Sequence, residues 1–399
     1  MMALSALWWA GVIVAASQGI VVPWSLPPAV AHSVLMTFGF MPLFFTGFLF
    51  TAGPKWLRQP AVPARRLLAP ILAQLSGWAA FVVACHARSA SLAVAFGALG
   101  LGVVAAGWLA STARFALSVR RSEVPDRVHS VLVACGCLVG VAGLSGASVG
   151  VASGDLALVR ACVHGSLWGF VGLVFATVSH RMGPYFSAAA VPVLDAWCPL
   201  WLLWTFVGVF VLQAAASMAD AYGLGEATSW RVARGVIETL AGTGILVLAI
   251  RRGLAKSLRI RLLAMLHVGF TWLGVSLLMA GISRLADLGG VTMTPAGLAA
   301  THAYTMGFLG STMFTMVSRV STGHSGRVVA ADDFLWRLFW MLQLAVLARL
   351  AGAVLVDSHP GVGEACILAA AMGWAGVCVA WGLRYGSWFG RPRPDGRPG

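Results

Sequence analysis

Charged residues are scarce in this sequence. Only 10% of its 399 residues are Asp, Glu, Lys or Arg, and just 13 of them are acidic. The hydrophobic share is 59% and the mean hydropathy is +0.86. A soluble globular protein of this length needs more polar surface, so the composition predicts an all-α polytopic membrane protein surrounded by lipid bilayer. The net charge of +14 does not indicate nucleic-acid binding, because the basic residues lie in loops between apolar runs, where membrane topology explains them.

Several chemical signatures are also absent. The seven cysteines contain no CxxC pair, and the closest two are Cys135 and Cys137, which argues against a disulfide framework or a zinc ribbon. The sequence has no Gly-rich phosphate loop, no GxSxG and no HExxH, so nothing supports hydrolase or nucleotide chemistry. The first 22 residues carry no basic segment, so we expect a retained first span and not a cleaved signal.

The apolar runs predict about twelve spans, since a helix needs about 20 apolar residues to cross a bilayer. Their connections are short, so we expect a single transmembrane domain over residues 1–385, followed by a cytoplasmic Pro/Gly/Arg tail at 386–399. The expected spans are 3–22, 28–52, 67–86, 90–111, 128–151, 156–179, 197–218, 229–250, 260–283, 295–318, 333–356 and 361–383.

The distribution of Lys and Arg predicts the orientation of these spans. Basic residues gather in the loops after even-numbered spans and in the C-terminal segment, and few lie in the other loops. The positive-inside rule then places both termini in the cytoplasm. His32, His164 and His302 fall in the first third of spans 2, 6 and 10, which puts all three in the outer half of the bilayer.

The other histidines divide into two groups. His86 and His359 fall in outer loops and His129 falls at the inner start of the fifth span, so we expect solvated surface positions for these three. His180 and His324 fall at the inner ends of spans 6 and 10, and the sequence assigns them no role.

The three outer histidines recur at a nearly constant interval. His32 and His164 are 132 residues apart, and His164 and His302 are 138 apart. Each interval holds four expected spans, which suggests three pseudo-repeats of four. A histidine inside an apolar span is costly and by default marks a site.

Two of these histidines are followed by methionine four residues later, as His32–Met36 and His302–Met306. This spacing places both side chains on one helical face. Imidazole and thioether are ligands of haem iron and of copper. The alternative is that each methionine packs in the core or against lipid while each histidine hydrogen-bonds a neighbouring helix. Small residues nearby would admit a flat macrocycle or a close helix; they are Gly39, Gly47, Gly165, Gly169, Gly307 and Gly310.

Few other polar groups fall inside the spans. Glu238 lies near the middle of span 8 and Arg349 deep in span 11. We expect them to pair with each other, the alternative being that Arg349 contacts a haem propionate. His267 in span 9 is a candidate ligand, a proton relay or a packed core histidine.

Four segments resemble the NnrS family, bacterial membrane proteins that contain haem and copper. The most specific segment is HAYTMGFLGSTMFTMVSRVSTGHSGR at 302–327. The others are LHVGFTWLGVSLLMAG at 266–281, HRMGPYF at 180–186 and AHSVLMTFGFMPLFFTGFLFTAGPKW at 31–56. Their order and the expected span number also agree with the family.

The resemblance implies a bacterial inner-membrane protein linked to nitric oxide metabolism, denitrification and protection against nitrosative stress. The family is similar in layout to subunit I of haem–copper oxidases, where histidines of spans 2 and 10 hold a low-spin haem. Carried onto this chain, that implies His32 and His302 as axial haem ligands. His164 and His267 are the next candidates, for a further metal site or for positions around the haem.

This chain departs from the family in two places. The family's second-span motif reads close to His-Ala-His-Glu-Met, whereas here Val30-Ala31-His32-Ser33-Val34 stands in its place. The oxidase copper site also needs a histidine pair in span 7, and that span has none. The sequence therefore supports haem more strongly than copper, and gives little support for a binuclear centre.

Two other functions remain open from the sequence. One is a twelve-span secondary transporter for a metal or metal complex, and the other is a non-catalytic membrane subunit of a respiratory assembly. The expected ligand is nitric oxide or another small diatomic molecule. The expected assembly partner is a second copy of the chain or a respiratory protein.

Overall fold

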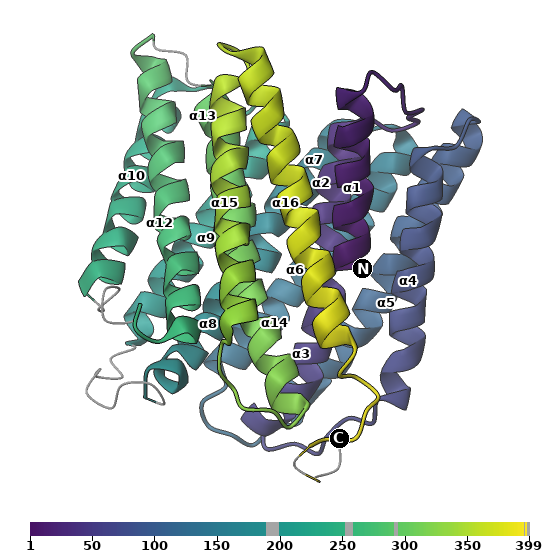
Figure 1. The fold of residues 1–399 in the computed structure, drawn as a ribbon, viewed down its shortest axis with the longest axis vertical. Helices are drawn as coiled ribbons and strands as arrows, with labels where there is room; N and C mark the ends of the chain where they lie inside the picture. Colours follow the sequence, from purple (N-terminus) through teal and green to yellow (C-terminus); the bar gives the residue numbers. More distant parts are fainter. Residues whose placement is uncertain (189–198, 252–257, 291–293, 395, 397–399) are drawn as a thin grey trace. The chain divides into compact units, whose positions relative to one another are not determined.

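The computed structural model describes residues 1–188, 199–251, 258–290, 294–394 and 396, and the regular elements in these ranges are all helices (Figure 1). The all-α polytopic architecture predicted from composition is confirmed. The chain packs as two compact units, which we describe separately. Apart from Met1, unit 1 comprises residues 22–184 and 196–225, and unit 2 comprises residues 2–21, 185–195 and 226–399. The expectation of a single transmembrane domain over 1–385 stays a prediction.

Ten helices in the described residues are long and apolar enough to cross a membrane, and they match ten of the twelve expected spans. The first expected span forms α1 (Met2–Ser17), which has 16 residues and ends before the predicted position 22. At 1.5 Å per residue it covers about 24 Å of a hydrocarbon core of about 30 Å. The tenth expected span is a continuous run of α13 (Thr294–His302), η2 (Ala303–Gly310) and α14 (Ser311–His324).

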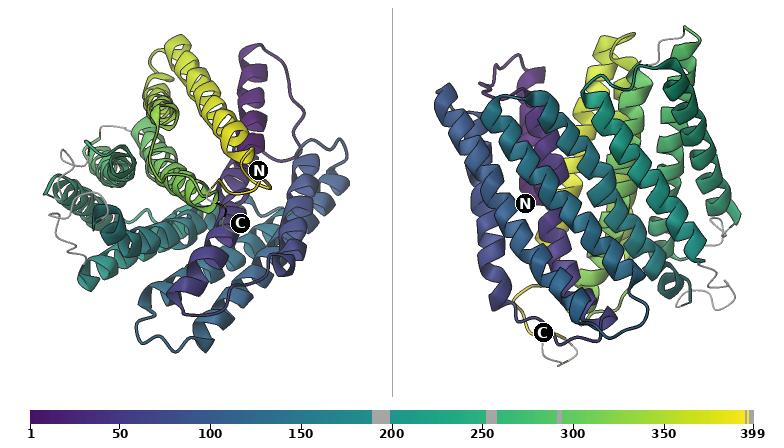
Figure 2. Two further views of the ribbon diagram at one scale, coloured as in Figure 1. Left: turned by 60° about the horizontal axis from the view of Figure 1, so that its bottom comes forward. Right: turned by 180° about the vertical axis from the view of Figure 1, so that it is seen from behind.

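Unit 1 is built around the two helices that carry His32 and His164. These spans, Pro28–Trp56 and Leu156–Met182, are the most buried spans of the unit. Figure 2 shows α4 and α5 side by side, and the neighbouring pairs α5–α6, α6–α7 and α7–α9 continue the packing. The elements of unit 1 are α2 (Pro28–Phe38), α3 (Met41–Trp56), α4 (Arg65–Cys85), α5 (Ala90–Arg121), α6 (Val128–Ser153), α7 (Leu156–Ser166), η1 (Leu167–Gly172), α8 (Leu173–Ala188) and α9 (Leu200–Ala221).

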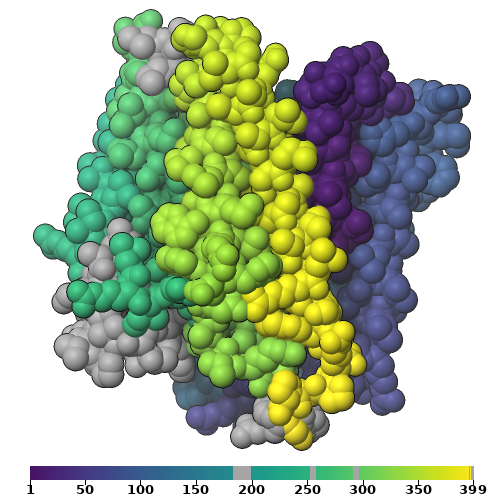
Figure 3. All heavy atoms as spheres, in the orientation of Figure 1, coloured from purple at the N-terminus to yellow at the C-terminus, as the bar shows by residue number. Residues whose placement is uncertain are grey.

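Unit 2 brings the first and last helices of the chain together. Besides α1, α13, η2 and α14, it contains α10 (Thr228–Arg251), α12 (Arg261–Leu288), α15 (Asp333–Leu355) and α16 (Pro360–Gly386). Ala6 and Ala10 of α1 pack against Ala375 and Cys378 of α16. The side chains of α15 and α16 lie against each other along their length (Figure 3). α12 contacts α10 on one side and α13, η2 and α14 on another.

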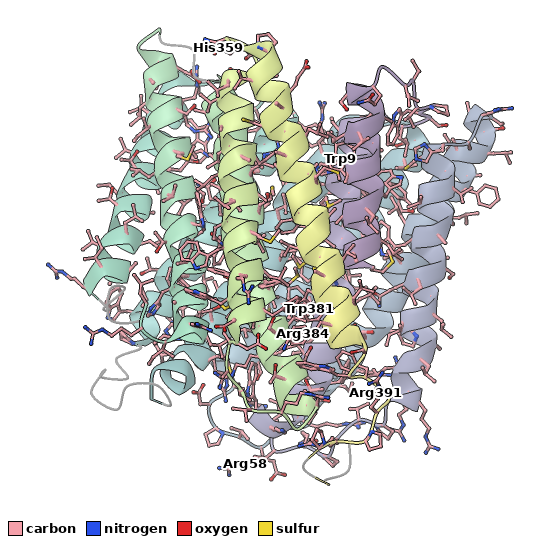
Figure 4. All side chains as sticks on the ribbon, viewed as in Figure 1. Trp9, Arg58, His359, Trp381, Arg384 and Arg391 are labelled. Atoms are coloured by element: carbon pink, nitrogen blue, oxygen red, sulfur yellow. The ribbon has the colours of Figure 1, made fainter. Side chains whose placement is uncertain are left out.

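α16 ends at Gly386, where the tail was expected to begin. His359 and Arg384 mark its two ends in Figure 4. In the tail, residues 395 and 397–399 lie outside the described residues.

Each of the three histidine spans departs from α-helical geometry just after its histidine. α2 ends at Phe38 and the helix resumes at Met41, six and nine residues beyond His32. The π-helical segments η1 and η2 begin at Leu167 and Ala303, shortly after His164 and His302. Such irregular segments weaken the regular backbone hydrogen bonding and are frequent at functional sites. The parallel is local, and the three pseudo-repeats of four spans stay a prediction.

Candidate histidine sites

His302 is the last residue of α13, and the backbone fixes the orientation of its ring. Its Nδ1 lies 2.9 Å from the carbonyl oxygen of Leu298, one turn earlier in the helix. A carbonyl oxygen only accepts, so Nδ1 carries the proton and donates it. In a neutral imidazole the Nε2 lone pair is then available to a ligand. Metal-binding histidines commonly have this arrangement, in which a backbone carbonyl holds the other ring nitrogen.

His302 lies on a narrow, partly exposed strip of an otherwise buried segment. Thr301, His302, Thr305 and Met306 are partly exposed, while Ala303, Tyr304 and residues 307–316 are buried. The helix therefore leaves the imidazole and the thioether of Met306 accessible together. This is the placement that the four-residue spacing predicted for the pair.

Arg349 of α15 brings a positive charge to His302. α13 packs on α15, and the Arg349 charge acts on the His302 ring. Within the described part of the chain, Arg349 Nη1 is a buried nitrogen without a hydrogen-bond partner. A buried guanidinium donor without an acceptor is costly. The structure therefore places an imidazole that is protonated at Nδ1 near a guanidinium whose Nη1 has no acceptor among the described residues.

The expected pairing of Arg349 with Glu238 is wrong. Glu238 of α10 accepts from Arg234 Nε at 2.9 Å and from Arg284 Nε of α12 at 3.3 Å. Arg234 lies one helical turn before Glu238, and α12 packs closely on α10, so both partners are nearer than α15. The prediction that Glu238 has a structural ion pair holds, with different partners.

Trp272 and a chain of hydrogen bonds hold η2 in place. A Cβ on Gly307 would lie 2.6 Å from Cγ of Trp272, so the indole fills the space that the sequence left for a macrocycle or a helix neighbour. Trp272 Nε1 donates to Gln343 Oε1 at 2.8 Å, and Gln343 Nε2 donates to Ser311 Oγ at 2.9 Å. These bonds join α12, α15 and α14 and fix the register of the segment that follows His302.

His267 lies on α12, the helix that packs against η2 and α14. Its ring is partly buried, and its backbone carbonyl accepts from Thr271 Oγ1 at 2.9 Å. It therefore lies in the same unit as His302, on a neighbouring element.

Unit 1 presents His32 in a similar way to His302. Between Val30 and Phe40, only His32, Ser33 and Met36 are partly exposed, and the other residues are buried. The His32–Met36 pair therefore also shares one accessible strip of a buried helix. Gly47 of α3 is also exposed, and no neighbouring atom lies within 4 Å of the position that a Cβ would take there.

His164 is partly buried near the end of α7, where the charges of Asp220 and Arg160 act on it. Asp220 belongs to α9, which packs on α7. The space beside Gly165 is occupied by Met218, because a Cβ on Gly165 would lie 2.8 Å from Sδ of that methionine. Trp168, four residues on, occupies the position that methionine holds after His32 and His302.

No group of three or more His, Cys, Asp or Glu side chains in the described ranges lies close enough together to hold a metal ion.

The comparison with protein families decides the identity of this fold. The sequence matches the family described as NnrS protein over residues 1–393, nearly the whole chain. The chain belongs to the NnrS family. No curated protein matches the sequence.

In this NnrS chain the structure also forms two polar contacts that the sequence analysis did not predict. One is the buried Arg234–Glu238–Arg284 cluster, whose i,i+4 spacing of Arg234 and Glu238 was visible in the sequence. The other is a buried contact between His129 and His180. The surface position expected for His129 is wrong, since only 7% of it is exposed. His359 is exposed and His86 is partly exposed, as expected for outer-loop residues.

Proposed function

We propose that this NnrS chain is a haem protein of the bacterial cytoplasmic membrane that takes part in nitric oxide metabolism or in resistance to nitrosative stress. The observation that carries the proposal is the pairing of His302 with Arg349 in unit 2. His302 offers an Nε2 lone pair, and Arg349 Nη1 is a buried donor that lacks an acceptor in the described chain.

The residues present fit a haem. Haem has an iron that binds imidazole and propionates that bind guanidinium groups. His302 would hold the haem iron through Nε2, and the Leu298 carbonyl would keep its Nδ1 protonated and its ring oriented. Arg349 would neutralise a propionate, and the propionate would accept a hydrogen bond from the buried Nη1. The haem iron, once bound, supplies the affinity for nitric oxide or another small diatomic molecule.

The second axial ligand is proposed from the family layout. His32, partly exposed on a buried helix beside Met36, is the candidate. His164, His267 and Met306 are further candidates for contacts with haem or with a separate metal. Copper is not part of the proposal, because the second-span motif lacks a histidine and the glutamate.

The orientation is proposed with both termini in the cytoplasm, because basic residues concentrate in the loops on that side. His302 and Arg349 then lie in the outer half of the bilayer. A respiratory electron donor or a second copy of the chain stays a prediction.

The test is the visible absorption spectrum of the detergent-purified protein, oxidised and reduced, after haem-sufficient expression. We expect haem bands in the native protein and in His359→Ala, whose histidine is exposed at the start of α16. We expect their loss in His302→Ala. We expect Arg349→Gln to lose haem about tenfold more readily than Arg349→Lys, because outer ligand partners typically change affinity by about 10- to 100-fold.

Two results would contradict the proposal. A native spectrum without haem bands would remove its mechanism, and bands unchanged in His302→Ala would remove the assigned ligand.

A transporter for a metal or metal complex is the second candidate, and one observation favours it. The buried span Pro28–Trp56 is broken at Gly39–Phe40, and secondary transporters place substrates at broken helices. Metal accumulation in vesicles containing the native protein, absent with His32→Ala, would support transport over a resident haem.

A further inference from the structure

A buried pair of histidines in unit 1 joins the start of α6 to the middle of α8. His129 Nε2 and His180 Nδ1 are 3.0 Å apart, and the two rings stack with centroids 5.2 Å apart. His180 Nε2 lies 3.2 Å from the carbonyl oxygen of Pro199, the residue that precedes α9. His129 and His180 are 7% and 6% exposed. The row of ring nitrogens therefore links the start of α6, the middle of α8 and the residue before α9.

The carbonyl at one end of the row determines where the protons lie. Pro199 O can only accept, so His180 Nε2 carries a proton. In a neutral ring His180 Nδ1 then has a lone pair, and it accepts from His129 Nε2. Neutral His129 therefore has a bare Nδ1. That nitrogen is buried and has no hydrogen-bond partner in the described part of the chain.

His129 also experiences the charge of an exposed carboxylate. Asp126 precedes α6 in an exposed loop, and its charge acts on His129. Its Oδ1 accepts from the backbone N–H of Val128 at 3.2 Å, which keeps the carboxylate at the helix start. A negative charge at this point stabilises a proton on His129.

Two arginines follow or precede the histidines in the sequence and bring positive charge to this part of unit 1. The Arg181 charge acts on His129, and its guanidinium lies over the Trp56 ring at 4.8 Å. Arg127 Nη1 donates to the carbonyls of Val119 and Ser122 at 3.2 and 3.0 Å. Both arginines have these other contacts. Asp126 is the acidic group whose charge acts on His129.

We propose that His129 and His180 form a binding site for one proton, with Asp126 as its entrance from water. Haem binding is not required for this site.

The transfer involves one proton and no electrons. A proton leaves the Asp126 carboxyl or an adjacent water, and an N–H bond forms at His129 Nδ1. The Nε2–H bond of the resulting imidazolium breaks as its proton moves along the 3.0 Å hydrogen bond to His180 Nδ1. The charge is then shared between the rings. Pro199 O takes no proton, so the proton is not passed on to that carbonyl.

The test is solid-state NMR of the full-length protein labelled with ¹⁵N-histidine in lipid, titrated from about pH 9 to pH 4. His129→Gln and His180→Gln assign the two signals. At high pH we expect both rings to be protonated at Nε2 and bare at Nδ1, with a cross-peak between His129 Nε2 and His180 Nδ1. On acidification both rings should change together at one midpoint with uptake of one proton.

Asp126→Asn tests the entrance without disturbing the pair. We expect its midpoint to fall by about half a pH unit, because the nearby carboxylate favours the cation. Glu123→Gln, which removes another exposed carboxylate of the same loop, should leave the midpoint unchanged.

Separate midpoints for the two rings would overturn the shared site. The absence of any change in either ring between about pH 9 and pH 4 would overturn proton binding. Equal shifts in Asp126→Asn and Glu123→Gln would overturn the entrance.

Discussion

At the scale of single residues, the buried charged groups of unit 2 differ in whether they have a partner among the described residues. Glu238 neutralises charge from two arginines, and its side chain is 1% exposed. Arg349 Nη1 has no such partner among the described residues. Burial of an ion is tolerated when its partner is present, and removal of one partner is strongly destabilising. This contrast is why Arg349, and not Glu238, is assigned to ligand binding.

Glu238→Gln should destabilise the protein by about 3 kcal/mol, because it removes the negative charge that pairs with the buried guanidinium of Arg234. Unfolding in a denaturing detergent titration measures the change. Glu226→Gln is the control, since Glu226 is exposed in the loop before α10. Equal effects of the two variants would show that the buried cluster is not needed for stability.

Asp332, just before α15, provides a pH-dependent contribution. Burial raises the pKa of this carboxyl, but hydrogen bonds from Arg384 and from the Leu335 N–H, with the charges of Arg384 and Arg261, outweigh it and leave the pKa below its ordinary value. A lowered folded-state pKa stabilises the fold above the unfolded value of 3.8, and this stabilisation is lost as the pH falls through the folded value.

Asp332→Asn should therefore lower the thermal unfolding temperature at neutral pH and have no effect once the native carboxyl is protonated. The asparagine can still accept the Leu335 N–H bond at the helix start. The loss should stay below about 1 kcal/mol, since the Asp332 and Arg384 side chains are 50% and 31% exposed. A difference that persists in strong acid would contradict the ion pair as its source.

At the scale of elements, close helix contacts depend on glycines that face each other. A Cβ on Gly242 of α10 would lie 2.7 Å from the carbonyl oxygen of Gly274 of α12, and one on Gly274 would lie 3.0 Å from that of Gly242. Small residues at such contacts let helices approach closely within a membrane. Figures 1 and 2 show α10 and α12 side by side.

Gly242→Ala should destabilise the protein by about 1–3 kcal/mol, because the methyl group meets backbone atoms that cannot move aside. Gly244→Ala on the same helix should be neutral or stabilising, since no atom lies within 4 Å of that Cβ position and alanine favours helix formation. Thermal unfolding in detergent compares the two. Destabilisation by Gly244→Ala alone would contradict the contact.

The irregular segments after the histidines show the limit of prediction for elements. The sequence predicted continuous spans at 28–52, 156–179 and 295–318. The structure has a break in the first and π-helical segments in the other two. Hydropathy reports only whether a residue favours lipid, and a π-helical turn does not change it. The packing of Trp272 against Gly307 is a tertiary contact that accompanies η2 and that no local pattern shows.

At the scale of the whole molecule, the proposed orientation can be tested at the two ends of α16. A phosphatase that is active only outside the cytoplasm should be inactive when fused to the C-terminus and active when inserted in the loop at 357–359. This expectation rests on the basic residues near the C-terminus, which the positive-inside rule places in the cytoplasm. Activity at the C-terminus would reverse the orientation and place His302 in the inner half of the bilayer.

The sequence by itself determined the class of this protein and its family. Scarce charge and long apolar runs require helices, because lipid offers no partners to backbone polar groups. The segments at 302–327, 266–281, 180–186 and 31–56 indicated the family that the match over 1–393 confirms. It also identified His302 and Met306 as neighbours on one helical face, since that depends only on helical spacing.

Only the tertiary structure decided which polar groups meet. It paired Glu238 with Arg234 and Arg284, left Arg349 beside His302, and buried His129 against His180. These contacts depend on which helices pack together and how they are rotated. Hydropathy and local spacing do not contain that information, because a lipid-facing and a helix-facing apolar surface have the same composition.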